Sequence, residues 1–307
     1  MPEIGPRPEP DDDPRGLLVA GHINVDRFLE LPEFPAPDRT VPIQNSRSAL
    51  GGPAANLARG SASYGIPTGL VGRIGADFPE EFHQRLRRAG IDLRGVERVP
   101  GVGTPTCYIL ENGRRETEVL IDQGPMGDNE ARPAIPRRLL SEYRWLHLTT
   151  GPPRWQLAWK AAARAAGLRV AVDPAQEVHY RWTPAQLRRL LNGAEILFGN
   201  RAEIDRIRRL LGARRVEELL TRVPLVIRTE GAQGATAFAR TGRVTVPGIR
   251  VPQPSTTVGA GDAFRAGFYF GWWAGAPMRD CLVAGHRSAA RWVRGGRLAR
   301  RRRRDRP

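Results

Sequence analysis

Apolar runs and amphipathic stretches alternate along most of the chain, which is the pattern of an α/β protein. Residues 17–24 form an apolar run without strict polar alternation, as expected for a strand buried on both faces of a mainly parallel sheet. Further strands are predicted at 68–74, 145–148, 168–172, 195–198 and 224–228. Helices are predicted at 79–89, 155–166, 183–191, 200–211, 263–274 and 277–294. Strand, helix and strand at this spacing imply right-handed βαβ units.

One segment departs from this alternation. Residues 104–111 and 116–122 are rich in Thr, Tyr, Ile and Val, and an Asn-Gly pair lies in the short connection between them. Asn-Gly between two such runs is a strong hairpin signal. A hairpin that interrupts a β/α pattern must pack outside the main sheet, so we expect it to join residues 41–46 in a small sheet over a pocket.

Composition fits a globular protein but the net charge is unusual. The 307 residues include 40% hydrophobic and 26% charged positions, yet the formal charge is +16, and Lys160 is the one lysine among 48 basic residues. A basic chain attracts polyanions. Because the arginines are spread along the whole chain, we interpret the charge as coding bias together with a preference for ligands such as nucleotides. A nucleic-acid partner is not expected.

The cysteines and the termini indicate a cytoplasmic protein. Cys107 and Cys281 lack metal-ligand spacing, and we expect two buried thiols in a reducing compartment. No window reaches the roughly 18 apolar residues of a membrane span. Residues 1–15 are rich in Pro and acid without an apolar signal core, which predicts a disordered tail, and residues 297–307 form an Arg-rich tail.

Candidate chemistry centres on residues 256–264. Gly259, Ala260 and Gly261 open a predicted helix, and such a start leaves backbone N–H groups free to bind an anion such as phosphate. Asp262 lies at the mouth of that site, where it could take a proton from an attacking hydroxyl. From these residues alone, a tight turn followed by a first-turn acid is an equal alternative.

Polar residues and glycines also follow the first strand. Asn24 and Asp26 come at its carboxyl end, where ligands gather in open α/β sheets, although a loop Asp bonded to local amides is an alternative. Gly51 and Gly52 permit close approach of the backbone, and Asn56 would project from the first turn of the next helix.

Two later strand ends carry polar residues with both structural and functional interpretations. Asn200 and Glu203 have the spacing of a helix capping box. Thr229, Gly231 and Gly234 suit a phosphate and ribose loop, but a plain glycine turn explains them equally well.

Together these stretches resemble the ribokinase-like (PfkB) carbohydrate kinase family. The resemblance rests on Gly-Gly-x-x-x-Asn-x-Ala at 51–58 and on Gly-Ala-Gly-Asp at 259–262. Gly-x-x-Asn-x-Asp at 21–26, Asn-x-x-Glu at 200–203 and Thr-x-Gly-x-x-Gly at 229–234 occur in family order. The resemblance implies a three-layer α/β/α fold with a mainly parallel central sheet, in a kinase domain over residues 16–296. A small β-sheet lid would be formed by segments at about 27–48 and 103–123. Lids of this family often pair into homodimers, but the sequence leaves the oligomeric state open.

The resemblance also implies roles for individual residues. Asp262 would be the catalytic base, and the amides of Gly259, Ala260 and Gly261 would stabilise the γ-phosphate of ATP in flight. Residues expected to bind the acceptor are Asn24, Asp26, Gly51, Gly52 and Asn56. Residues expected to bind the nucleotide are Asn200, Thr229, Gly231, Gly234 and His286.

Metal dependence is implied as well. Glu203 would organise Mg²⁺ through water, which suits an ion that keeps most of its waters. Thr256 stands where the family has an Asp that helps to bind a monovalent cation, so no such site is expected. For His286 a surface position without a role is the alternative.

Two kinds of acceptor are compatible with these residues. Polyhydroxylated rings fit the acceptor residues, which favours a ribokinase-like or fructokinase-like enzyme acting on a small sugar. However, Pro53 replaces a Lys usual in ribokinases, and residues 147–151 lack a Glu that many sugar kinases have, so a nucleoside kinase is the alternative. From another class, an inactive nucleotide-binding or nucleic-acid-binding protein is a further alternative.

Overall fold

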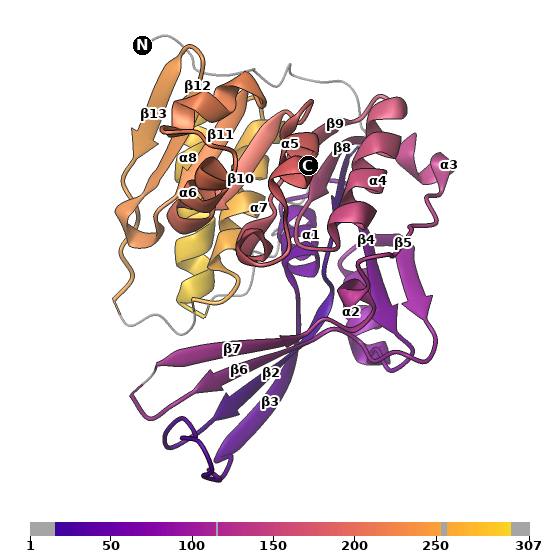
Figure 1. Cartoon of the computed structure of the whole chain (residues 1–307), viewed down its shortest axis with the longest axis vertical. Coiled ribbons are helices and arrows are strands. Elements are labelled where there is room, and N and C mark those ends of the chain that lie inside the picture. The colour runs from indigo at the N-terminus through magenta and orange to yellow at the C-terminus, as the bar shows by residue number, and fades with distance from the viewer. Residues whose placement is uncertain (1–15, 115, 253–256, 296–307) are drawn as a thin grey trace, which may run out of the picture.

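A nine-stranded sheet forms the middle layer of the body of the molecule (Figure 1). The computed structural model describes residues 16–114, 116–252 and 257–295. The strand order is β13-β12-β11-β10-β9-β8-β1-β4-β5. The strands are β1 (Gly16–Ala20), β4 (Thr68–Gly75), β5 (Asp92–Val99), β8 (Tyr143–Leu148), β9 (Arg169–Val172), β10 (Ile196–Asn200), β11 (Leu225–Thr229), β12 (Ala235–Ala239) and β13 (Gly242–Val246). All pairs from β5 to β11 are parallel, whereas the β11–β12 and β12–β13 pairs are antiparallel, so β12 runs opposite to the other strands described in this sheet.

Helices cover both faces of this sheet and create two cores. Leu17 and Val19 of β1 join one core, whereas Leu18 and Ala20 join the other, so β1 is buried on both faces as its sequence predicts. The helices of the first core are α1 (Pro53–Ser63), α2 (Glu80–Arg88), α7 (Ala260–Trp273) and α8 (Met278–Val293). The helices of the second are α3 (Arg137–Leu140), α4 (Pro153–Ala165), α5 (Pro184–Leu191) and α6 (Arg201–Leu210). Short 3₁₀ turns are η1 (Gly124–Gly127), η2 (Ala175–His179), η3 (Val216–Thr221) and η4 (Gly231–Gln233).

A second, four-stranded sheet projects from the body, at the bottom of Figure 1, and is called the small sheet below. Its strands, in the order β3-β2-β6-β7, are β2 (Asn24–Glu30), β3 (Asn45–Gly51), β6 (Thr106–Glu111) and β7 (Thr117–Asp122). The central pair, β2 and β6, is parallel, and the two outer pairs are antiparallel. The predicted hairpin is therefore confirmed, and it packs outside the main sheet.

The structure corrects the predicted strands at two places. The first strand ends at Ala20 rather than at residue 24, because the chain turns at Gly21, with a φ of 151°, and Asn24 then begins β2 of the small sheet. Strand β5 was missed. It is an edge strand of the main sheet, none of its eight residues is fully buried, and its sequence therefore lacks a continuous apolar run.

Other expectations meet the structure in part. Both cysteines are free, and Cys281 is buried, but Cys107 is partly exposed because it lies in β6 of the projecting small sheet. Within the described ranges, no helix has the length and apolar character that crossing a membrane requires. The predicted tails at 1–15 and 297–307 lie outside the described residues, as does Thr256.

Candidate active site

The N-terminus of α7 is an open anion site. Gly259 precedes the helix with a φ of 80°, a left-handed conformation that glycine adopts without a steric penalty. Among the described residues no side chain caps this end of the helix. The amide of Ala260 donates to the backbone oxygen of Thr257 over 3.2 Å, and the Gly261 amide, which has no backbone partner in the described part of the chain, is available to a ligand. Asp262 lies in the same turn and is half-buried. An acid and an anion site therefore adjoin, as the sequence predicts.

A hydrogen bond ties Asp262 to the start of α1. The side-chain nitrogen Nδ2 of Asn56 donates to Oδ2 of Asp262 over 3.0 Å. Burial raises the pKa of Asp262 to about 7, although the Arg265 guanidinium and the Asn56 hydrogen bond act in the opposite direction. A carboxylate whose pKa lies near neutrality is well suited to accept a proton at physiological pH.

A second acid with a raised pKa belongs to the small sheet. Burial and, after it, the charge of Asp262 raise the pKa of Asp26 in β2 to about 7, while Arg47 and Arg59 oppose the rise. The effect of Asp262 on the pKa of Asp26 places the two carboxyl groups within electrostatic reach of each other. Two residues earlier in β2, Oδ1 of Asn24 is buried and makes no hydrogen bond within the described part of the chain. Such an oxygen is available to a ligand hydroxyl.

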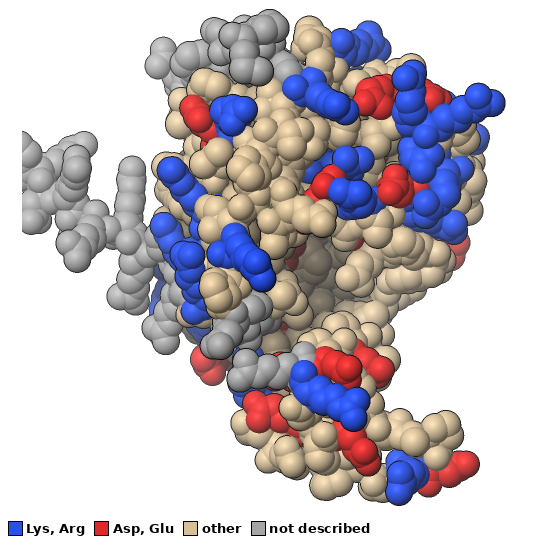
Figure 2. All heavy atoms as spheres, turned by 90° about the vertical axis from the view of Figure 1, so that its left-hand side faces the viewer, with Lys and Arg blue, Asp and Glu red and all other residues tan. Residues whose placement is uncertain are grey.

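Two glycines let β3 and α1 approach these polar residues. A Cβ atom on Gly51 would collide with the carboxylate of Asp26. One on Gly52, which has a φ of 89°, would lie 2.7 Å from the backbone nitrogen of Asn24. Only residues without side chains fit here, so the predicted acceptor-site residues are brought together. Figure 2 shows the molecule hollowed between the body and the small sheet.

Behind Asp262 lies a buried charged group that the sequence reasoning missed. The guanidinium of Arg265, one turn along α7, forms an ion pair with Asp173 at the end of β9. A Cβ on Gly261 would lie 2.7 Å from Nη1 of Arg265, so this cation lies directly beneath the anion site. Burial opposes its charge, but the carboxylates of Asp173, Glu203 and Asp262 keep its pKa above the usual range. The one hint in the sequence was Asp173, which directly follows the predicted strand at 168–172, where ligands and charged groups gather in such sheets.

The predicted nucleotide residues meet at one edge of the sheet. Asn200 ends β10, Thr229 ends β11, and the two are paired in register. Asn200 and Glu203 also form the capping box, because Oε2 of Glu203 accepts from the Asn200 backbone over 2.7 Å and Oδ1 of Asn200 accepts from the Glu203 backbone over 2.9 Å. Gly231 and Gly234 both have positive φ, at 58° and 129°. The capping box expected at Asn200 and Glu203 is therefore present, and Gly231 and Gly234 lie in a turn that favours glycine.

His286 is not at the surface, so that alternative is wrong. It is 6% exposed because α8 packs on α7, and its ring lies edge-on to Phe264 at 5.1 Å between centroids. A cavity of about 490 Å³ runs along α8, and its lining residues are Ile249, Arg287, Ala290, Arg291, Arg294 and Gly295. His286 is not part of that wall.

The residues near Glu203 fit a hydrated divalent cation. Oδ1 of Asp173 is buried and makes no hydrogen bond within residues that the structure describes. The charges of Asp173 and Glu203 both raise the pKa of Asp262, whereas Arg265 lowers it, so both carboxylates lie within electrostatic reach of Asp262. No group of three His, Cys, Asp or Glu residues among residues 16–114, 116–252 and 257–295 could hold a metal directly. An ion that keeps most of its waters, as Mg²⁺ does, matches this arrangement.

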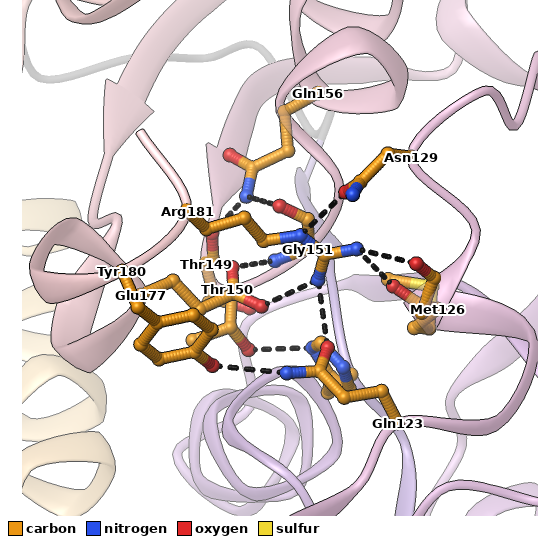
Figure 3. Close-up of polar contacts among 12 residues, drawn as sticks. Gln123, Met126, Asn129, Thr149, Thr150, Gly151, Gln156, Glu177, Tyr180 and Arg181 are labelled. Atoms are coloured by element: carbon orange, nitrogen blue, oxygen red, sulfur yellow. Dashed lines mark hydrogen bonds and ion pairs between the residues drawn. The ribbon is translucent and has the colours of Figure 1, made fainter. Parts of the chain in front are cut away.

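A polar network joins the end of the small sheet to the body (Figure 3). Nη1 of Arg181 donates to Oε1 of Gln123 over 2.7 Å, and Nε2 of Gln123 donates to the hydroxyl of Tyr180 over 2.9 Å. Nearby, Nδ1 of His22 and the hydroxyl of Thr150 lie 2.9 Å apart. The ring of Tyr180 is nevertheless 63% exposed. The network therefore holds an exposed aromatic side chain in place near the point where the chain leaves β7.

The fold and the site together define a class. A parallel sheet between helices, a projecting small sheet and an acid beside an uncapped helix start are the features of a ribokinase-like phosphotransferase that acts on an alcohol group. A model of the pfkB family carbohydrate kinases matches residues 15–297, and the chain belongs to this family. The resemblance found in the sequence is thereby confirmed.

The chain is also similar to individual kinases of known activity. The chain is 31% identical to a nucleoside kinase of Methanothermobacter thermautotrophicus, over 87% of this chain and 85% of the relative. It is 32% identical to an ATP-dependent ribose-1-phosphate kinase of Halopiger xanaduensis, over 83% and 84%. The crystal structure of Methanocaldococcus jannaschii nucleoside kinase superposes with a TM-score of 0.84 at 24% identity, covering 93% of this chain and 94% of that one.

Proposed function

We propose that the protein transfers the γ-phosphoryl group of ATP to a hydroxyl of a small sugar, free or carried in a nucleoside, with Asp262 as general base. The observation that carries this proposal is the carboxyl group of Asp262, whose pKa is about 7, beside the uncapped start of α7. The acceptor oxygen forms a bond to the γ-phosphorus as the bond from that phosphorus to the β-phosphate oxygen breaks. The hydroxyl proton moves to Asp262, and ADP leaves.

The phosphate side of the site supplies charge stabilisation. Phosphoryl transfer passes through a loose transition state, so positioning and fixed positive potential provide most of the rate. The amides of Gly259 and Gly261 and the buried cation of Arg265 beneath them would provide that potential. Glu203 and Asp173 would hold Mg²⁺ through water, and the ion when bound would neutralise charge on the ATP phosphates.

The nucleotide base has a matching cavity. The hollow of about 490 Å³ along α8 is lined by Arg291 and Arg294 at the end of the helix whose Trp292 contacts the loop at Gly259, and we assign the adenine to it. Asn200 and Thr229, paired at the sheet edge, would contact the ribose and phosphates. A contact from His286 to the adenine stays a prediction, and its burial against Phe264 does not favour it.

On the acceptor side, Asn24 and Asp26 would bind sugar hydroxyls. The unpaired Oδ1 of Asn24 supports this role. Because both residues belong to β2, we propose that the small sheet acts as a lid that expels water when the acceptor binds, which would protect ATP from hydrolysis.

A nucleoside is favoured over a free sugar by one further observation. Tyr180 holds an exposed aromatic ring at the end of the small sheet through Gln123, and a flat apolar surface of this kind suits a nucleobase. The similarity to a nucleoside kinase points the same way. Ribose 1-phosphate is the competing acceptor, because Arg47 and Arg59 lie within electrostatic reach of Asp26 and could pair with a phosphate.

The deciding experiment is a screen of ADP release with ATP and Mg²⁺. The acceptors are nucleosides, ribose, fructose and ribose 1-phosphate, and the Asp262→Asn variant serves as the blank. We expect the highest kcat/KM with a nucleoside. A higher value with ribose 1-phosphate or a free sugar would overturn the choice of acceptor, and ADP release that no acceptor stimulates would overturn the kinase assignment.

We also propose a cytoplasmic homodimer that forms through the small sheet. β7 is an edge strand whose six residues are all exposed, among them Val119 and Leu120, and exposed edge strands favour pairing. Free thiols fit a reducing compartment. Sedimentation equilibrium should give twice the chain mass, and Leu120→Lys should shift it to the monomer. A monomer in the unmodified protein would contradict the dimer.

A further inference from the structure

The last turn of α8 touches the loop that forms the anion site. Nε1 of Trp292 donates a hydrogen bond to the backbone oxygen of Val258 over 2.7 Å. The same indole lies against Gly259, since a Cβ there would be 3.0 Å from Cζ2 of Trp292. One side chain therefore contacts the two residues that immediately precede α7.

Peptide geometry turns this contact into a constraint on the anion site. The peptide between Val258 and Gly259 is planar and trans, so its C=O and N–H point in opposite directions. Because the carbonyl of Val258 is held toward Trp292, the N–H of Gly259 points away from α8. Gly259 has access to left-handed and right-handed conformations alike, so its own backbone preference does not fix this orientation.

The position of Trp292 is itself well determined. α8 packs closely on α7 at glycines: a Cβ on Gly285 would be 2.7 Å from the ring of Phe264, and one on Gly267 would be 2.6 Å from Cβ of Ser288. Close packing of two helices leaves little freedom for the side chain that ends one of them. Several buried tryptophans in the described part of the chain make no hydrogen bond through Nε1. Nε1 of Trp272, for example, makes no hydrogen bond among residues that the structure describes.

We infer that Trp292 is a positioning residue for phosphoryl transfer, in which its indole N–H holds the carbonyl of Val258 and thereby aims the Gly259 amide at the transferring group. The inference rests on the proposed kinase function. An aimed donor acts mainly on charge that develops in the transition state, and loss of one such donor typically costs about 10²–10³ in kcat. If the Gly259 amide is retained but no longer oriented, kcat should fall by less, about 10-fold to 100-fold.

The test uses three variants of the full chain with the best acceptor of the screen. Trp292→Phe keeps a ring against Gly259 but removes the N–H, and Trp292→His returns a ring donor. Trp272→Phe is the matched control, since that indole is buried in α7 without a hydrogen bond. We expect Trp292→Phe to lower kcat about 10-fold to 100-fold with KM for ATP changed less than about threefold, and Trp292→His to recover part of the loss. The control should keep kcat.

Two results would overturn the inference. One is a kcat of Trp292→Phe within about twofold of the unmodified protein, and the other is a loss that falls on KM for ATP alone. Amide hydrogen exchange of residues 257–262 gives a readout that does not need turnover, so it tests the positioning even if no acceptor is phosphorylated. Exchange there should be about tenfold faster in Trp292→Phe than in the control, and equal exchange would contradict the role of the indole.

Discussion

The side-chain amide of Asn56 donates a hydrogen bond to the carboxylate of Asp262, although 206 positions separate the two residues in the sequence. Each lies in the first turn of a helix that follows glycine, α1 for Asn56 and α7 for Asp262. The two glycine-rich helix starts thus converge on a single carboxylate. This convergence places the acceptor residues next to the anion site.

Replacement of the proposed base should abolish most of the turnover. Asp262→Asn keeps the size of the side chain but cannot accept the hydroxyl proton, and general base catalysis contributes about 10²–10⁴ in rate. We expect kcat to fall by about that factor, measured by ADP release. The control is Asp280→Asn, an exposed acid in the first turn of α8, which should keep kcat. A variant at position 262 with turnover close to the unmodified enzyme would exclude Asp262 as the base.

Loss of the Asn56 hydrogen bond should change the pH dependence. The bond lowers the pKa of Asp262, so Asn56→Ala should raise that pKa above about 7. The base must be ionised to act, and the acid limb of kcat/KM should therefore move to higher pH, with the largest loss of rate below about pH 7. Because Asp26 titrates in the same range, the limb reports the apparent pKa of the pair.

The profile is measured from about pH 5 to about pH 9, where the folded state must be confirmed at each point. Asn45→Ala is the control, because Asn45 is exposed in β3 and its amide contacts Glu30 instead of the site. An acid limb that stays in place in Asn56→Ala would show that the hydrogen bond does not tune the base.

The same raised pKa predicts a stability gain in an inactive variant. Between the ordinary pKa of 3.8 and about 7 the folded protein binds more protons at Asp262 than the unfolded chain, so stability falls as pH rises through this window. Asp262→Asn removes that penalty. Its Tm should exceed that of the unmodified protein above about pH 7, and the difference should shrink toward about pH 4. A difference in Tm that is independent of pH would contradict the raised pKa.

The buried pair behind the site should show strong coupling. Arg265→Met would leave three carboxylates near one another without their cation, and we expect a loss of about 3–5 kcal/mol in the free energy of unfolding. Adding Asp173→Asn to that variant should recover part of the loss. Urea unfolding of both single variants and the double variant measures the interaction. The exposed pair of Arg154 and Glu130 is the control and should couple by less than about 1 kcal/mol. Additive effects at Arg265 and Asp173 would disprove the coupling.

Sequence reasoning reached the parts of the fold that have a local signature. The buried strands show as apolar runs, and the start of α7 shows through Gly259, whose left-handed backbone needs glycine. It failed where the reason for a residue is long-range. Arg265 on an otherwise apolar helix gave no local hint that its partner, Asp173, lies 92 positions earlier at the end of β9. His286 was misjudged for a similar cause, because its burial depends on the packing of α8 against α7.

Asn24 and Asp26, the proposed acceptor residues, belong to β2 of the small sheet, whereas Asp262 belongs to the body. A rotation of the small sheet about its base would change the separation of the two acids. Neither the body nor the small sheet alone therefore contains the complete proposed site, which depends on how the two parts are joined. Substitutions that change how the small sheet joins the body, even away from the reacting atoms, should therefore alter the choice of acceptor and the rate of transfer together.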